Sequence, residues 1–232
     1  MKTIGVLGGL GPQATMDFEA RVHAVSQRLI PPRANSGYPP MIVYYHRTAP
    51  IVVDEDGKPI VPIEMHPALR EKLEAFGTLA DFLVITANSP HVLKDIFEQV
   101  SGLKVLSIID VTLEEARNRG WGKLGVLGLG EPRVYMAPLD ELGVPYETLS
   151  GDLEELRNRL DRSIIALMEG RAGPGETAVA MEAVEALRGK GVEGLILGCT
   201  EIPLLLGEAA EAPDLINPAT LLAEAAVRYA VE

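Results

Sequence analysis

Short apolar runs bounded by glycine alternate along this chain with stretches whose apolar residues recur at helical spacing. Such alternation is typical of parallel strands joined by crossover helices. The pattern therefore predicts an α/β fold built on parallel sheets. Predicted strands cover residues 3–8, 41–46, 82–87, 104–108, 123–128, 145–148 and 193–198, and predicted helices cover residues 12–29, 66–77, 91–99, 111–119, 133–142, 152–169, 175–190, 201–209 and 218–230.

Two parts of this pattern occur twice. Residues 81–91 resemble residues 193–203, and residues 3–12 resemble residues 123–132. The repeat predicts two similar parallel-sheet α/β half-domains related by a pseudo-twofold axis, with an active-site cleft between them. The first domain is expected to span residues 1–110 and to be completed by a C-terminal helix in residues 213–232, and the second to span residues 111–212.

The repeat sets Ala87 against Cys199, which is the single cysteine of the chain. Open α/β sheets bind ligands at the carboxyl ends of their strands. Both positions follow a predicted strand, so we expect them to flank one substrate.

Residues 50–63 lack both helical and strand periodicity. They are expected to form a loop or a short hairpin. Such a segment would be suited to act as a lid.

Composition and charge limit the classes of partner. The net charge of −12 offers no basic surface for nucleic acid, and no apolar run approaches the ~18 to 20 residues of a membrane span. One cysteine cannot form an internal disulfide, and the first residues lead directly into a strand without a basic leader, so we expect a cytoplasmic protein. The partner is expected to be a small molecule. No His, Cys and Asp spacing predicts a metal site.

The turn after the first strand has three interpretations. Residues 9–14 fit the pattern G-x-G-x-x-A of dinucleotide-binding turns, but that pattern requires an acidic residue at the end of the second strand, where the chain has Arg47. The turn can instead let backbone N–H groups near Gly9 approach a carboxylate, or it can bind nothing.

Cys199 lies between a predicted strand and a predicted helix. A thiol at a helix N-terminus has a lowered pKa, because the amide dipoles stabilise the thiolate. We therefore expect Cys199 to be a catalytic base or nucleophile, the alternative being a buried, inert cysteine. Asn88, Ser89 and Thr200 would place hydrogen-bonding side chains near the same point, or cap the following helices. Glu201 is expected to cap its helix or to orient a substrate amine.

Four segments resemble motifs of the aspartate/glutamate racemase superfamily, and specifically its aspartate racemase branch. They are residues 5–12, Arg47-Thr48, residues 88–91 and residues 198–201. The resemblance spans nearly the whole chain, and it implies a small carboxylate or amino-acid substrate and a homodimer. It implies an enzyme without pyridoxal phosphate or metal, in which two cysteines on opposite faces of the substrate Cα exchange a proton and invert the centre.

The same resemblance implies roles for particular residues. Arg47 is expected to hold the distal carboxylate of the substrate, with Arg171 as the nearest candidate for a basic residue from the second half. The histidine at position 91 is expected to support its turn through a hydrogen bond.

The chain also departs from the family. Ala87 replaces the first catalytic cysteine, and residues 129–131 replace threonines that bind the α-carboxylate in the family. The negative charge of Glu131 would oppose a carboxylate there. Alanine can neither donate nor accept a proton, so symmetrical two-thiol racemisation is not available to this sequence.

Three functional classes remain open. The first is an aspartate/glutamate-type racemase in which Cys199 serves one face of Cα, while water or a group such as His46 serves the other. The second is a single-thiol decarboxylase of a malonate-type acid, which Arg47 disfavours because such enzymes need an apolar pocket with oxyanion donors. The third is a catalytically silent protein that binds a carboxylate.

Overall fold

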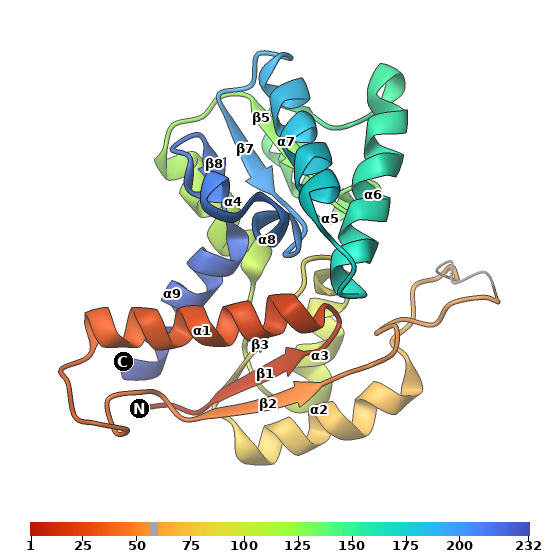
Figure 1. The fold of residues 1–232 in the computed structure, drawn as a ribbon. Helices are drawn as coiled ribbons and strands as arrows, with labels where there is room; N and C mark the ends of the chain where they lie inside the picture. Colours follow the sequence, from red (N-terminus) through yellow and green to blue (C-terminus); the bar gives the residue numbers. More distant parts are fainter. Residues whose placement is uncertain (56–59) are drawn as a thin grey trace. The chain divides into compact units, whose positions relative to one another are not determined.

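The computed structural model describes residues 1–55 and 60–232, and the chain divides into two compact units (Figure 1). Unit 1 comprises Met1–Ile108 together with Ala219–Glu232, and unit 2 comprises Ile109–Pro218. The C-terminal helix therefore belongs to the unit that begins the chain.

Unit 1 is built on a parallel sheet. Its strands are β1 (Ile4–Gly8), β2 (Met41–Tyr45), β3 (Phe82–Ile85) and β4 (Val105–Leu106), in the order β2-β1-β3-β4. Every residue of β1 and β3 is buried, because helices cover both faces of the sheet. Continuous apolar sequence is what strands in this position require.

Five helical segments surround this sheet. They are α1 (Pro12–Leu29), α2 (Pro67–Leu79), the 3₁₀ segment η1 (Ser89–Leu93), α3 (Lys94–Ser101) and α9 (Pro218–Val231). Figure 1 shows α1 along one face of β1 and β2 and α2 along the other. Proline begins α1 because its missing N–H is not needed in the first turn of a helix. In α9, Tyr229 packs edge-on against Phe82 with ring centroids 4.9 Å apart.

Unit 2 repeats this plan. Its strands are β5 (Leu124–Leu127), β6 (Tyr146–Glu147), β7 (Gly194–Leu197) and β8 (Leu215–Ile216), all parallel and in the equivalent order β6-β5-β7-β8. Its helices are α4 (Ile108–Asn118), α5 (Arg133–Leu142), η2 (Gly151–Leu153), α6 (Glu154–Met168), α7 (Pro174–Arg188), α8 (Ile202–Leu206) and η3 (Gly207–Glu211). Figure 1 shows α6 and α7 side by side. The prediction of two similar parallel α/β sheets is confirmed.

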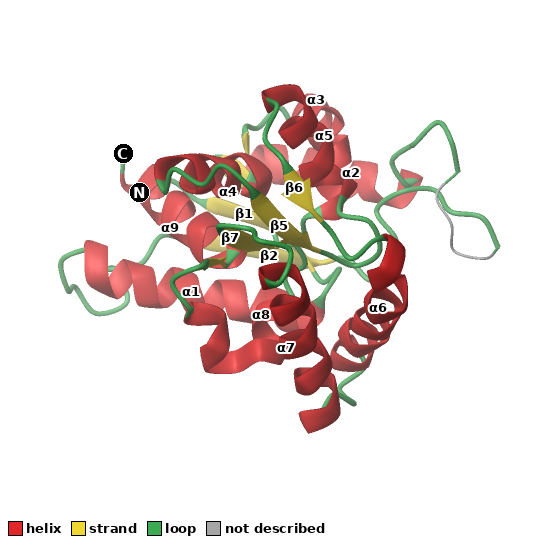
Figure 2. Cartoon of the chain, turned by 90° about the horizontal axis from the view of Figure 1, so that it is seen from above, coloured by secondary structure: helices red, strands yellow, loops and turns green. Residues whose placement is uncertain are grey.

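The connection between β2 and α2 is the segment predicted as a loop or hairpin. Ile51 forms an antiparallel bridge with Met65, and the N–H of Val52 donates to the carbonyl of Glu64 over 2.9 Å. Figure 2 draws the described part of this connection as loop. The lid predicted for it includes residues 56–59, which lie outside the described residues.

Among the described residues, no helix combines the length and the apolar character that crossing a membrane would need.

Candidate functional site

Gly9 forms the turn between β1 and α1. Its φ of +80° lies in the left-handed region that favours glycine, and a Cβ there would stand only 2.7 Å from the Cα of Tyr45. Its N–H donates to Oγ1 of Thr15 over 2.9 Å. The N–H of Gly9 itself is thus bonded inside the protein, and the approach of a carboxylate to this turn stays a prediction.

A pair of buried threonines joins this turn to the end of β3. Thr15 is fully buried, and its Oγ1 lies 2.8 Å from Oγ1 of Thr86. The N–H of Thr86 in turn donates to the carbonyl of Leu7 over 3.1 Å. These bonds fix the backbone immediately before Ala87.

The three residues that follow Thr86, which are Ala87, Asn88 and Ser89, differ in their exposure to solvent. Ala87 is half-buried, Asn88 is 4% exposed and Ser89 is exposed. His91 holds this turn, since its Nδ1 donates to the carbonyls of Ala87 and Asn88 over 3.0 and 3.1 Å. Its Nε2 accepts the N–H of Ile108 over 3.3 Å. The predicted supporting role of His91 is confirmed.

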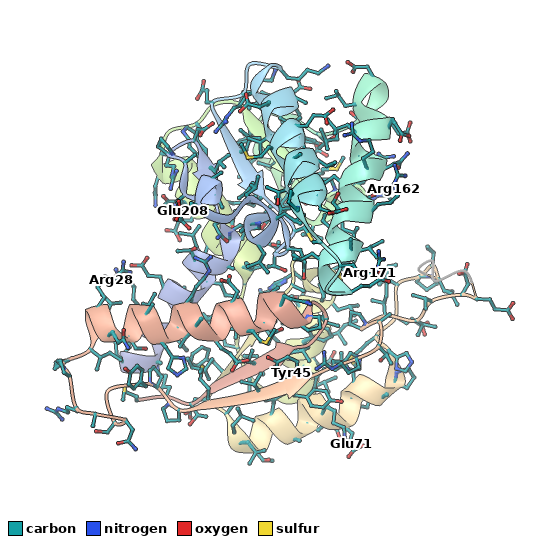
Figure 3. All side chains as sticks on the ribbon, in the orientation of Figure 1. Arg28, Tyr45, Glu71, Arg162, Arg171 and Glu208 are labelled. Carbon is teal, nitrogen blue, oxygen red and sulfur yellow. The ribbon has the colours of Figure 1, made fainter. Side chains whose placement is uncertain are left out.

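Arg47 follows β2 as an exposed cation. Its guanidinium carbon lies 4.8 Å from the ring centroid of Tyr45, whose hydroxyl donates to Glu19 over 2.8 Å (Tyr45 is labelled in Figure 3). No carboxylate forms an ion pair with Arg47 in residues 1–55 and 60–232. The guanidinium fork is thus held on an aromatic ring with its charge available to a ligand.

His46, which was considered for proton exchange on the face opposite Cys199, already hydrogen-bonds to other residues of the protein. It is 3% exposed, and its Nε2 lies 2.9 Å from Oγ1 of Thr48. Burial lowers the pKa of its imidazole, although a hydrogen bond to the backbone of Ala49 acts in the opposite direction. A neutral, buried ring of this kind is poorly suited to exchange protons with a substrate.

In unit 2, Gly198 sets the position of Cys199. A Cβ at Gly198 would stand 2.6 Å from the carbonyl oxygen of Leu127 and 3.0 Å from the ring of Tyr135. Tyr135 is fully buried, and burial raises the pKa of its phenol. Only glycine lets β7 end against this ring, which places the thiol directly after the sheet.

The thiol of Cys199 forms a compact group with its two successors. Cys199 is half-buried, and its Sγ lies 3.1 Å from Oε2 of Glu201. Oγ1 of Thr200 donates to the same oxygen over 3.2 Å, and the backbone N–H of Glu201 donates to the sulfur. Both residues after the cysteine are 4% exposed.

The prediction of a lowered thiol pKa is wrong. Burial raises the pKa of Cys199 well above its ordinary value, and the negative charge of Glu201 adds to the effect. The helix that was expected to stabilise the thiolate, α8, has only five residues and begins at Ile202. A short helix contributes little dipole, so desolvation and the adjacent carboxylate prevail.

Asp161 of α6 adds a second negative charge near the thiol. Its Oδ1 accepts the N–H of Gly130 over 2.8 Å, and burial raises the pKa of its carboxyl. In the same loop, Glu131 pairs with Arg133 over 2.8 Å and both side chains are exposed. The loop after β5 therefore lies beside the carboxylates of Glu131 and Asp161, and the N–H of Gly130 is already bonded to Asp161.

Arg171 lies just beyond α6 (Figure 3), where its exposed guanidinium bonds the carboxylate of Glu169. This ion pair competes with any carboxylate ligand, and the assistance expected from Arg171 stays a prediction.

Glu201 is the N-cap residue of α8, yet its side chain makes no capping hydrogen bond. The capping role considered for it is therefore wrong. Its carboxylate instead faces the thiol.

A cavity of about 570 Å³ in unit 2 is lined by α4, α5 and the residues that precede β5, including Trp121. It adjoins the first residue of β5, Leu124. Cys199 follows the last residue of the adjacent parallel strand β7, so this cavity does not belong to the thiol site. Within the described parts of the chain, no three His, Cys, Asp or Glu side chains converge as metal ligands would.

The fold and this thiol site place the chain among known proteins. Residues 7–226 match the Asp/Glu/hydantoin racemase family, and the chain belongs to that family. It is 32% identical over 137 residues to RacX, a broad specificity amino-acid racemase of Bacillus subtilis (strain 168). That match covers 58% of this chain and 57% of the relative, so it spans little more than half of each.

Solved structures share the fold over the full length of the chain. An aspartate racemase homologue from Pyrococcus horikoshii OT3 superposes with a TM-score of 0.76 at 23% identity, covering 100% of both chains. The aspartate racemase of Picrophilus torridus gives a TM-score of 0.76 at 19% identity, covering 100% of this chain and 95% of its own. These similarities support the fold.

Several residues of the site were not foreseen from the sequence. Thr15 and Thr86 carry no signal of their contact, because they lie far apart in the chain. Asp161 sits within a helix of many charged residues, and only the fold brings it near Cys199. Tyr45 stands two residues before Arg47, and this i, i+2 spacing along an extended segment was the available clue.

Proposed function

We propose that this chain is an amino-acid racemase that needs no cofactor and acts at Cα through Cys199. The observation that carries the proposal is the half-buried thiol after β7, whose Sγ lies 3.1 Å from the carboxylate of Glu201. Membership of the Asp/Glu/hydantoin racemase family supports proton transfer at a carbon centre as the reaction.

Arg47 supports an acidic amino acid as the substrate. Its guanidinium is exposed, rests on Tyr45 and has no ion-pair partner in the described part of the chain. A planar fork of this kind binds a carboxylate through two parallel hydrogen bonds. The similarity to RacX supports a range that extends beyond one amino acid.

The protonation state of the thiol defines its part in the reaction. Because burial and Glu201 raise its pKa, Cys199 rests as a protonated thiol near neutral pH. After a base removes the Cα proton, the electron pair delocalises into the α-carboxylate, and Cys199 delivers its proton to the opposite face of that carbon. The thiolate so formed recovers a proton before the next cycle, and the configuration at Cα is inverted.

Ala87 makes the proposed reaction asymmetric. Water serves the face opposite Cys199, since alanine has no acid or base and His46 is bonded internally. Slow turnover is the expected consequence, because water at neutral pH is a weak base. Ala87 also favours a second candidate, a single-thiol decarboxylase in which Cys199 protonates the carbanion left by CO₂ loss.

Incubation with a panel of amino acids in deuterated water tests the proposed function. A racemase should exchange the Cα proton of at least one amino acid for deuterium, which nuclear magnetic resonance detects without net inversion. Release of CO₂ from malonates, with no exchange in any amino acid, would favour the decarboxylase. Absence of both reactions in the folded protein would leave a carboxylate-binding protein.

Arg47→Lys should weaken the binding of aspartate by about tenfold or more, because lysine keeps the charge but loses the two-pronged geometry. Isothermal calorimetry measures the dissociation constant. Arg70→Lys serves as the matched control, since Arg70 is an exposed arginine on α2 that lies 4.0 Å from the carboxylate of Glu74. An unchanged constant in Arg47→Lys would remove Arg47 from the binding site.

A further inference from the structure

One oxygen of the Glu201 carboxylate has no hydrogen-bond partner. The two donors around this side chain, Cys199 and Thr200, both converge on Oε2, at 3.1 and 3.2 Å. Oε1 is buried and accepts no hydrogen bond from the described residues. A buried carboxylate oxygen without a donor is costly, and natural proteins retain such a group where a ligand or reaction uses it.

Glu201 also lacks a counter-charge. No lysine, arginine or histidine of the described chain forms an ion pair with it. Burial to 96% deprives the carboxylate of water as well, since only 4% of the residue is exposed. A cation with N–H donors would supply both the hydrogen bond and the counter-charge that this carboxylate lacks.

The charged groups around the thiol of Cys199 give its surroundings a negative electrostatic potential. Besides Glu201 on the same turn, Asp161 approaches from α6, and Tyr135 approaches from α5 as a neutral phenol. Arg157 and Arg162 lie near Asp161 and moderate its charge. An anionic group would be repelled beside Cys199, whereas an ammonium would be attracted.

We propose that Glu201 is the receptor for the α-ammonium group of the substrate, which binds through Oε1 beside the thiol. The inference rests on the proposed racemase function and names the substrate group that unit 2 selects. The torsion χ3 of glutamate is soft, so the carboxylate can turn its open oxygen toward a ligand next to the half-exposed Cys199. It follows that the site takes α-amino acids in preference to dicarboxylates that lack the amine.

Binding of the ammonium has a chemical consequence for Cys199. The carboxylate of Glu201 disfavours the thiolate, and a cation paired with that carboxylate offsets its charge. The thiol should therefore ionise more readily when an amino acid is bound than when the site is empty.

Binding near neutral pH, where the α-amine of a free amino acid is protonated, gives a direct test. Isothermal calorimetry measures the dissociation constants of aspartate and of succinate, which has both carboxylates but no amine, in the full-length protein. Aspartate should bind about tenfold more tightly than succinate, because only its ammonium group can pair with the carboxylate of Glu201.

Two variants separate the ammonium receptor from general electrostatics. In Glu201→Gln the dissociation constant of aspartate should rise by about tenfold, to that of succinate, while the constant of succinate should not change. Asp161→Asn removes the other nearby charge, and in this variant aspartate should still bind more tightly than succinate. Circular dichroism confirms folding, and the comparison of aspartate with succinate in the unaltered protein stands even if a variant does not fold.

The outcomes distinguish this inference from the proposed function. If aspartate binds no more tightly than succinate, or binds equally well in Glu201→Gln, Glu201 is not the ammonium receptor and the racemase proposal stands. If aspartate does not bind at all, the acidic amino-acid substrate is wrong and the inference fails with it.

Discussion

Replacing Ala87 by cysteine should raise the rate of aspartate racemisation by about 10² to 10⁴, the usual contribution of one positioned acid or base. Ala87 holds the same place after β3 that Cys199 holds after β7, and both are half-buried. The hydrogen bond from His91 to its carbonyl fixes the backbone from which the new thiol would project. Chiral chromatography of aspartate after incubation measures the gain.

Two controls make this result specific. Ala87→Ser introduces a side chain of similar size without a thiol and should give no comparable gain. The double variant Ala87→Cys with Cys199→Ser should lose the gain, because one face of Cα is then without its proton donor. If Ala87→Cys folds and binds aspartate yet forms no enantiomer, the pairing of positions 87 and 199 or the racemase proposal is wrong.

Cys199→Ser should reduce exchange of the Cα proton by about 10² to 10⁴ in the amino acid that the unaltered chain exchanges best. A serine hydroxyl is far less acidic than a thiol and cannot replace it as the proton donor. Deuterium incorporation followed by nuclear magnetic resonance gives the rate. Binding of the amino acid should persist, because the carboxylates of Glu201 and Asp161 and the guanidinium of Arg47 are unaltered.

A structural role for the thiol predicts a different pattern. An inert cysteine replaced by serine would lower the melting temperature and leave the exchange rate per folded molecule unchanged. Thr112→Ser is the control, because it removes one methyl group from another buried residue of unit 2 and therefore changes only the packing. Equal exchange rates in Cys199→Ser and Thr112→Ser would exclude Cys199 from catalysis.

Much of the fold follows from the periodicity of the sequence. The first helix spans residues 12–29 as predicted, since Pro12 marks its start and apolar residues at helical spacing continue to its end. Strand β8 (Leu215–Ile216) was not predicted, because these residues fall within the segment 213–232 that was assigned to the C-terminal helix. The repeat was visible because residues 5–8 and 125–128 share the run Gly-Val-Leu-Gly and because Pro12 corresponds to Pro132.

The electrostatics of the site were harder to predict from the sequence. The position of Cys199 after a strand was correctly predicted, but the direction of its pKa shift was not. That direction depends on the way Glu201 turns its carboxylate back toward the sulfur and on the approach of Asp161 from another helix. Sequence spacing gives neither a side-chain torsion nor a contact between distant segments.

The order of the units along the chain has a consequence for biosynthesis. Unit 2 is one continuous segment, whereas unit 1 needs its last residues, including Tyr229, which packs on Phe82, and Ala230, whose carbonyl accepts the N–H of Lys2 over 2.8 Å. During synthesis, unit 2, which carries the thiol, can therefore complete its contacts before α9, the helix that completes unit 1, has been translated. Unit 1 can therefore form all of its contacts only after α9 has followed unit 2.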